Sequence, residues 1–392
     1  MNDLARHYSR FRVGERLLFT GHSHQAWPDV ALQGQIDAFL DAAEGVDTKW
    51  GRAFAVADRV RDGFRAFLDE PGAELALGQN THELVLRFLS ALDLRGRPRL
   101  ITSDGEFHTL RRQLARLGEA GIELVVVPTD PVETLAERMA ARIDDRTAAV
   151  LVSAVLFGTS AIVPNLGELA ANRRGAELLV DSYHALGAVP FSVPGMGLTD
   201  AWVVGGGYKY LQLGEGNCFL RLPAHAQELR PVITGWYAEF GELATRRDPG
   251  EVGYATGGMR FAGATYDPTS NYRAARVFDF LTERGLTAQR LREISLRQNT
   301  LLADDFDALN IPDDIATRDR TRPRTAFGGF LTVETPHAAR FQERLAERGV
   351  ATDSRGNHLR FGPAPYLRAD QLHAAMAVLG EVIAEYGQES PS

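Results

Sequence analysis

The 392-residue sequence has one cysteine, Cys218, and no apolar run near the ~18 residues that a membrane-spanning helix needs. A single cysteine cannot form a disulfide within the chain, so we expect a protein of the reducing cytoplasm. The N-terminal segment is polar and lacks the apolar core of a signal peptide. The net charge of −8 provides no basic face for nucleic acid or an anionic membrane, so neither is expected as a partner.

Several short motifs of common enzyme classes are also missing. No GxGxxG opens a helix after a strand and no GxxxxGK[ST] occurs, which argues against the usual nucleotide-binding loops. No CxxC pair is present, which excludes a zinc–cysteine cluster. No GxSxG elbow is present for a serine hydrolase. The chemistry must therefore be sought in other residues.

The first two thirds of the chain alternate short apolar runs with amphipathic segments. This rhythm predicts an α/β protein with a mostly parallel sheet and helices on both faces, followed by a smaller α+β C-terminal domain. We expect an N-terminal segment 1–50 packing with the small domain, a large domain 51–261 and a small domain 262–392. The predicted strands of the large domain are 75–78, 100–102, 122–127, 148–154, 178–181, 201–204 and 218–222. The predicted helices include 30–43, 52–68, 83–92, 132–143, 166–174, 272–284, 287–309, 336–348 and 369–386.

The stretch 177–216 organises these expectations. A short apolar run ends on Asp181, and a second run leads through three glycines, 205–207, to Lys209. A pyridoxal phosphate enzyme needs this pair, because the lysine forms the Schiff base and the carboxylate keeps the pyridine nitrogen protonated. The glycines would let the backbone turn tightly beside the cofactor. Each feature alone is also common in α/β proteins without a cofactor.

Other polar or aromatic residues follow predicted strands, where ligands bind in open α/β sheets. Thr81 is a helix N-cap candidate, and with Asn80 it would offer an anion site at a helix N-terminus. A simple cap is the alternative. Phe107 would stack on a flat ring or else be an ordinary core residue. Ser153 follows the strand before Asp181.

The loop around Gly21 is rich in polar side chains, among them His22, Ser23 and His24. The two histidines alternate, so a metal pair is conceivable. A loop that reaches toward an active site and a plain surface turn are the other two interpretations. We expect no bound metal at this loop.

With these residues in view, the chain resembles the kynureninases, which are fold-type-I, class-V-aminotransferase-like pyridoxal phosphate enzymes. The resemblance covers most of the chain and is densest in VDSYHALGAVP, GGGYKYLQLGEG and HLRFGPAPY. It implies pyridoxal 5'-phosphate as the cofactor, an amino-acid substrate and a homodimer. The chain departs from the family pattern in three places. His22 stands where the family has Asn, Leu110 stands where the family has an acid, and the family's Gly-Thr-Pro element is altered at 263–268.

The resemblance also implies a role for each candidate residue. Lys209 would carry the cofactor and move protons, with Tyr208 assisting. Asp181 would hold the pyridine nitrogen and His184 would lie close to the ring. The remaining implied contacts are Asn80, Thr81 and Tyr208 with phosphate, Trp236 with phosphate across the dimer, Phe107 stacked on the ring, Arg360 on the substrate carboxylate, and His22 and Ser23 near the substrate.

Three functions remain open at this stage. The first is hydrolysis of L-kynurenine or 3-hydroxykynurenine to alanine and an anthranilate. The second is transamination, β-elimination or epimerisation of another amino acid. The third is a non-catalytic protein that keeps the fold, against which the presence of both Asp181 and Lys209 argues. A cysteine desulfurase is disfavoured because no cysteine follows Cys218, which lies in an apolar strand and is expected in the core.

Overall fold

The computed structural model describes residues 3–389 except 243–244, 246–247 and 249. Its centre is a seven-stranded sheet in the order β2-β8-β7-β6-β5-β3-β4. The five strands from β7 to β4 are parallel, whereas β8 runs antiparallel to both β7 and β2. The mostly parallel α/β sheet that the sequence predicts is therefore confirmed. The strands are β2 (Glu74–Gly78), β3 (Arg99–Ser103), β4 (Glu123–Val127), β5 (Thr147–Ser153), β6 (Glu177–Asp181), β7 (Trp202–Gly206) and β8 (Cys218–Leu222).

Alternating side chains of the central strands enter two different cores. Leu178 and Val180 of β6 belong to one apolar cluster and Leu179 to the other. Because successive strand residues point to opposite faces, both faces of the sheet are covered by helices. Phe88 of α3 lies in the core of Leu179, and Phe64 of α2 lies in the core of Val180. The helices of this part are α2 (Trp50–Phe67), α3 (Thr81–Ser90), α4 (His108–Glu119), α5 (Leu135–Ala140) and α6 (Leu166–Ala171).

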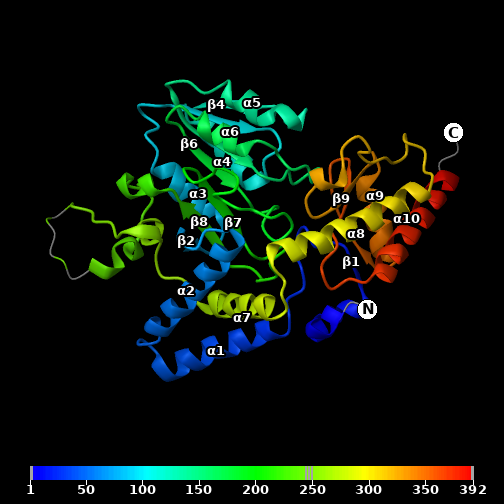
Figure 1. The fold of residues 1–392 in the computed structure, drawn as a ribbon, viewed down its shortest axis with the longest axis horizontal. Helices are drawn as coiled ribbons and strands as arrows, with labels where there is room; N and C mark the ends of the chain where they lie inside the picture. Colours follow the sequence, from blue (N-terminus) through cyan, green and yellow to red (C-terminus); the bar gives the residue numbers. More distant parts are fainter. Residues whose placement is uncertain (1–2, 243–244, 246–247, 249, 390–392) are drawn as a thin grey trace.

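The C-terminal part is built on a small antiparallel sheet in the order β11-β12-β9, and Figure 1 shows it beside α8, α9 and α10. None of the described helices is long and apolar enough to cross a membrane. The elements are α8 (Ala288–Ala308), β9 (Leu331–Glu334), α9 (Ala338–Glu347), β10 (Val350–Ala351), β11 (Asp353–Arg355), β12 (His358–Phe361) and α10 (Ala369–Glu389).

The N-terminal segment joins the two parts. β1 (Leu17–Leu18) pairs in parallel with β10, and Thr20 bridges to Gly362, so this stretch lies on the C-terminal part. α1 (Val30–Gly45) then packs against α7 (Thr269–Glu283), which also packs against α2. The domain boundaries given above remain predictions.

The expectations for the start of α3 and for the helix 132–143 were wrong. The N-cap of α3 is Asn80, whose Oδ1 accepts a hydrogen bond from the Glu83 N–H at 2.9 Å, and Thr81 is the first helical residue. Both residues are good caps, and the backbone of Asn80 is the one that is extended. The predicted helix 132–143 is a 3-10 turn (Val132–Thr134) followed by the short α5, because the backbone of Thr134, with φ −109° and ψ 5°, leaves the helical region between them.

The three glycines before Lys209 serve close packing rather than a turn. None of them has a positive φ, and Gly205 and Gly206 end β7. A Cβ on Gly207 would lie 2.1 Å from Cδ1 and 2.9 Å from Cβ of Leu213. Leu213 N–H also donates to the Gly207 carbonyl at 3.0 Å, so this contact closes the loop that carries Lys209.

We predict that Gly207→Ala lowers the free energy of unfolding by about 1–3 kcal/mol, because the added methyl must displace Leu213 from a filled core. Urea denaturation followed by circular dichroism measures it. Gly51→Ala is the control, since nothing lies within 4 Å of a Cβ at Gly51 and alanine is favoured in a helix. Equal stability of the two variants would contradict the packing argument.

Candidate functional site

The register of the large sheet brings polar residues to one edge. Ser153, the last residue of β5, is paired with Asp181, the last residue of β6, and Asp181 is paired with Val204 of β7. On the antiparallel side, Cys218 at the start of β8 is paired with Gly206 and with Gly78. The carboxyl ends of the parallel strands and the start of β8 therefore form one edge, as expected for a ligand site in this class of fold.

A cavity of about 240 Å³ opens at this edge, and we call it the lysine cavity. Seven of the eleven residues predicted from the sequence line it, drawn from the ends of strands and from the starts of α3 and α4. The seven are Asn80, Thr81, Phe107, Asp181, His184, Tyr208 and Lys209. Seven residues that the sequence singles out separately therefore line one cavity.

Lys209 is 6% exposed, and its Nζ lies 2.7 Å from Nε2 of His184. The amine also lies 4.9 Å from the ring centre of Tyr183 and 5.4 Å from that of Phe107. Burial, opposed mainly by Asp181 and reinforced by Arg360, lowers the pKa of Lys209 to about 7. The amine therefore has a large neutral, nucleophilic fraction near neutral pH.

His184 and Asp181 are the polar neighbours of the amine. Burial and then the Lys209 charge hold the pKa of His184 well below its usual value, so its ring is neutral. The Nδ1 of His184 is buried and has no hydrogen-bond partner among the described residues. Asp181 accepts a hydrogen bond from the Tyr183 N–H at 2.8 Å, and burial raises the pKa of its carboxyl.

The start of α3 forms another wall. Asn80 and Thr81 lie there, where the first backbone N–H groups of a helix are directed toward anions. Tyr208 lies beside them in the cavity lining, stacked on His24 at a ring separation of 4.8 Å. Burial raises the pKa of Tyr208 to about 12, so its hydroxyl stays protonated and can donate.

Aromatic rings bound the cavity near the start of α4. Phe107, 36% exposed, packs edge-on against Phe157 at a ring separation of 5.4 Å. The tilted pair of Tyr183 and Tyr208, 4.9 Å apart, adds a further aromatic wall. A flat ligand is suited to such walls.

Arg360 and His22 lie behind the cavity and do not line it. The Nε and Nη2 groups of Arg360 donate to Asp353, and its Nη1 donates to the Phe157 carbonyl at 2.5 Å. His22 is buried, and its Nε2 is 3.9 Å from Asp353. Burial lowers the pKa of His22 to about 4. His22 is thus a neutral group beside a buried ion pair.

Ser23 and Trp236 lie outside this cluster, and His24 contacts it only through its stacking on Tyr208. The Ser23 hydroxyl is 3.1 Å from Nδ1 of His24, an exposed residue, so the two histidines of the loop point to different environments. Trp236 is 44% exposed, stacks on Tyr237 and donates through Nε1 to Thr265 at 3.2 Å. Within one chain these residues do not meet Lys209.

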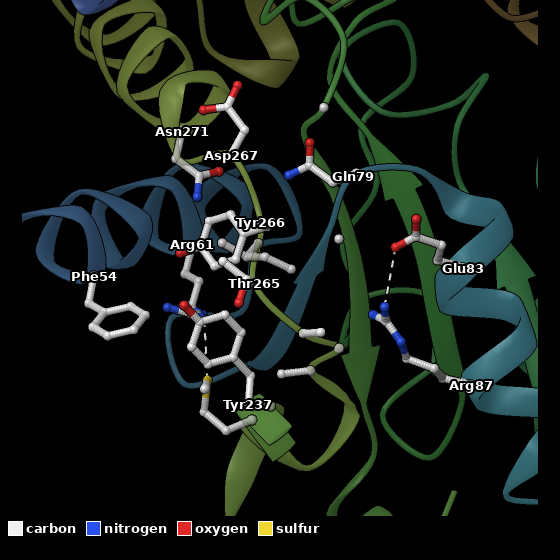
Figure 2. Close-up of a pocket in the computed structure, with 18 residues that line it drawn as sticks. Phe54, Arg61, Gln79, Glu83, Arg87, Tyr237, Thr265, Tyr266, Asp267 and Asn271 are labelled. Atoms are coloured by element: carbon white, nitrogen blue, oxygen red, sulfur yellow. Dashed lines mark hydrogen bonds and ion pairs between the residues drawn. The ribbon is translucent and has the colours of Figure 1, made fainter. Parts of the chain in front are cut away.

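A second, larger cavity of about 500 Å³ adjoins the first and is shown in Figure 2. Gln79 and Gly216 line both cavities, so the two are neighbours. The side chains drawn in Figure 2 include Phe54, Tyr237 and the ion pair of Glu83 with Arg87, but no lysine. The lysine therefore lines the smaller cavity and not the larger one.

Several residues in or next to the site were not predicted from the sequence, among them Tyr183, whose ring centre lies 4.9 Å from the Lys209 amine. Glu106 is 1% exposed and accepts hydrogen bonds from the hydroxyls of Ser103 and Ser153, each at 2.6 Å. Burial raises the pKa of Glu106 to about 7. Asp353, which holds Arg360, and Phe157 were also missed. Only Glu106 carried a signal, an acid directly before the predicted stacking residue.

The comparisons with known proteins are consistent with this geometry. No protein-family model matches the chain. A kynureninase of Geobacillus thermodenitrificans is 24% identical over 324 residues, which cover 78% of this chain and 72% of that protein. Among solved structures, a mutant of C-DES with glycine covalently linked to its PLP cofactor has a TM-score of 0.83 at 16% identity, covering 96% of this chain and 98% of that chain.

A cysteine desulfurase from Thermococcus onnurineus NA1 has a TM-score of 0.80 at 16% identity and covers 98% of each chain. The chain has the fold-type-I architecture of pyridoxal-phosphate-dependent enzymes. The kynureninase likeness inferred from the motifs is thereby supported by an independent match over most of the chain. The solved neighbours, at 16% identity, establish the fold and leave the reaction to be argued from the site.

We predict that acetylation of Lys209 in the cofactor-free protein accelerates with pH and levels off above about pH 7 to 8. The neutral amine is the nucleophile, so a lowered pKa moves the plateau to lower pH. Acetic anhydride pulses and peptide mass spectrometry measure the rate. Lys49, the chain's other lysine, is labelled in the same sample and serves as the control. A Lys209 rate that still rises through pH 10 would contradict the buried environment.

Proposed function

We propose that the protein is a pyridoxal phosphate enzyme acting on an amino acid, with the lysine cavity as its active site. The observation that carries this proposal is a buried, readily deprotonated lysine beside a strand-end carboxylate. The unpartnered Nδ1 of His184 and the N-terminus of α3 provide further polar groups that fit a phosphorylated pyridine. Lys209 would hold the aldehyde carbon, Asp181 the ring nitrogen, and Asn80, Thr81 and Tyr208 the phosphate.

When bound, this cofactor supplies an electron sink for bonds at the substrate α-carbon. The residues of the chain do the rest. Lys209 in its neutral form takes a proton at Nζ, and the neutral ring of His184, 2.7 Å away, can accept a hydrogen bond from the resulting ammonium at Nε2. Tyr208 keeps its proton at neutral pH and can donate it to a developing oxyanion. The aromatic walls limit the access of water to the amine.

Arg360 would hold the substrate carboxylate. A guanidinium has five N–H donors, and Asp353 and the Phe157 carbonyl occupy three of those of Arg360. Two N–H groups, one on each terminal nitrogen, are not used by these partners, and the wall between Arg360 and the lysine cavity would have to open for a substrate to reach them. Asp353 fixes the plane of the guanidinium, and such a held fork suits a carboxylate. His22 lies beside the same pair, where the substrate side chain would be read.

For the reaction itself we propose kynureninase-type hydrolysis of L-kynurenine or 3-hydroxykynurenine to alanine and an anthranilate. The support is the identity with a kynureninase over 78% of the chain, together with the motifs at 177–216 and 358–366. Water would add to the side-chain carbonyl after Lys209 has taken the α-proton. The aromatic walls offered by Phe107 and Phe157 suit an aryl side chain.

The second candidate is a carbon–sulfur lyase acting on cystine or a related amino acid. It is favoured by the similarity of the fold to the cystine C-S lyase C-DES, which has a TM-score of 0.81. A persulfide-forming desulfurase with Cys218 as its nucleophile is disfavoured. Cys218 is 3% exposed, and burial raises the pKa of its thiol to about 12. Transamination or epimerisation would use the same lysine and has no separate support.

We predict that the protein reconstituted with pyridoxal phosphate converts L-kynurenine to anthranilate, followed by loss of kynurenine absorbance and gain of anthranilate fluorescence. Lys209→Ala should lower the rate by about 10³-fold or more, as expected for removal of a positioned proton-transfer group. Lys49→Ala is the matched control and should leave the rate unchanged. Visible cofactor absorbance with intact kynurenine would reject the substrate. Pyruvate or sulfide from cystine would then favour the second candidate.

We further propose that two copies of the chain form the active dimer. One face of α1, with Ala31 and Gly34, is buried, where a Cβ on Gly34 would meet the backbone of α7. The other face exposes Ile36, Phe39 and Leu40, with Phe39 73% exposed. An unpaired apolar helix face of this kind is typical of an interface. The indole of Trp236 is 44% exposed and would be accessible to a second copy, although its Nε1 already donates to Thr265.

We predict that light scattering after gel filtration gives the mass of a dimer, twice 43.0 kDa. Phe39→Glu should weaken association, because it places a charge in an apolar contact, whereas Phe39→Leu keeps the face apolar and should stay dimeric. If Phe39→Glu remains a dimer, the dimer interface does not include this face of α1. A monomer for the unchanged protein would reject the dimer.

A further inference from the structure

Glu106 is a buried acid beside the lysine cavity that the proposed reaction does not use. It lies in the loop between β3 and α4, directly before Phe107, and is 1% exposed. Its Oε1 accepts from the Ser103 hydroxyl at 2.6 Å and from the Ser153 N–H at 3.2 Å, and its Oε2 accepts from the Ser153 hydroxyl at 2.6 Å. These surroundings supply three donors, which suit a charged carboxylate.

No cation of the chain balances that charge. In the part of the chain that the structure describes, neither Glu106 nor Asp181 forms an ion pair, and the Nζ of Lys209 contacts His184 instead. Burial, with a smaller contribution from Asp181, raises the pKa of Glu106 to about 7 against the hydrogen bonds of the two serines. A buried carboxylate without a cation is costly, so a ligand that brings positive charge to this place would be favourable.

One short segment joins Glu106 to Asp181. Ser153, the last residue of β5, is paired with Asp181 of β6, so the two side chains point to the same face of the sheet. The N–H of Ala154 donates to the Asp181 carbonyl at 2.8 Å. Ser153 and Asp181 line the lysine cavity, whereas Glu106 does not. Glu106 therefore lies behind Ser153 and acts on a ligand only through this wall.

The contact with Glu106 also sets the direction of the Ser153 hydroxyl. A hydroxyl has one proton and two lone pairs, and the proton of Ser153 is donated to Glu106. Only lone pairs of this hydroxyl are then left for a ligand. Together with the carboxylate of Asp181, Ser153 makes this wall an acceptor of negative character. A ligand group with a polar hydrogen or a positive charge fits it better than a bare acceptor does.

We propose that Glu106 is a positioning residue, which holds Ser153 as an acceptor and adds a second negative charge behind Asp181. The two effects favour a ligand ring that carries a proton at the atom facing Asp181. This inference rests on the proposed function, in which that atom is the pyridine nitrogen of the cofactor. Glu106 itself touches neither cofactor nor substrate, so its contribution is to the choice of ring.

The test is equilibrium dialysis of the cofactor-free protein at about pH 8, where Glu106 is mostly ionised. Two ligands are compared, pyridoxal phosphate and its deaza analogue, in which a C–H group replaces the ring nitrogen. They share the aldehyde and the phosphate, so the ratio of their dissociation constants isolates the contact at Asp181. The unmodified protein should prefer pyridoxal phosphate, and Asp181→Asn should lose most of that preference.

Glu106→Gln should lower the preference about tenfold, because the charge is lost and the amide NH2 group makes the Ser153 hydroxyl an acceptor from it, with its own proton free to turn to the cavity. Ser153→Ala should lower the preference about threefold, and it keeps the proposal testable if Glu106→Gln does not fold. Thr102→Val is the matched control. It removes a buried hydroxyl of β3 that donates to the Leu151 carbonyl at 3.1 Å and not to Glu106, so the ratio should stay unchanged.

The outcomes separate this inference from the proposed function. An equal loss of affinity for both ligands in Glu106→Gln would assign that residue a purely structural role and overturn the proposal, and so would a full preference in Glu106→Gln. An unchanged ratio in Ser153→Ala alone would overturn the part assigned to its hydroxyl. In each of these cases the unmodified protein still binds pyridoxal phosphate and the proposed function stands. If the unmodified protein binds neither ligand, the proposed function fails and this inference fails with it.

Discussion

The site depends on the removal of one ammonium group from water. Lys209 is enclosed by the rings of Tyr183 and Phe107, and this desolvation outweighs the attraction of Asp181. The same burial keeps His184 neutral, so the closest polar neighbour of the amine adds no positive charge that would repel an ammonium. Other features serve this arrangement: the close contact of Gly207 with Leu213 closes the loop that carries Lys209, and the strand register brings Asp181 to it.

Much of this could be predicted because it is encoded locally. Short apolar runs such as that before Asp181 have one stable placement, buried in a parallel sheet, and the carboxyl ends of such strands meet at one edge. Residues a few positions after a strand, including Lys209 and Phe107, could therefore be expected at this edge, and both line the lysine cavity. Seven of the candidate residues line this single cavity.

The remaining features depend on contacts between distant segments. Glu106 is part of the site because Ser153, 47 residues later, donates to it, and nothing near Glu106 encodes that partner. Arg360 was expected to face a substrate, yet Asp353 on the adjacent strand takes part of its fork, a pairing set by the register of β11 with β12. Asn80 and Thr81 have equally suitable side chains for an N-cap. The cap is Asn80 because its backbone is the extended one, and the side chains alone do not encode that difference.

These distant contacts converge on the segment around Phe157. Its carbonyl accepts from Arg360, its ring packs on Phe107, and its neighbours are hydrogen-bonded to the C-terminal part. A shift of that part would therefore move the guanidinium and the aromatic wall together. Packed interiors respond in discrete steps rather than by continuous deformation, so the two groups would change position as one unit. If Arg360 holds a substrate carboxylate as proposed, the seating of the C-terminal part would affect substrate selection together with the residues that touch the substrate.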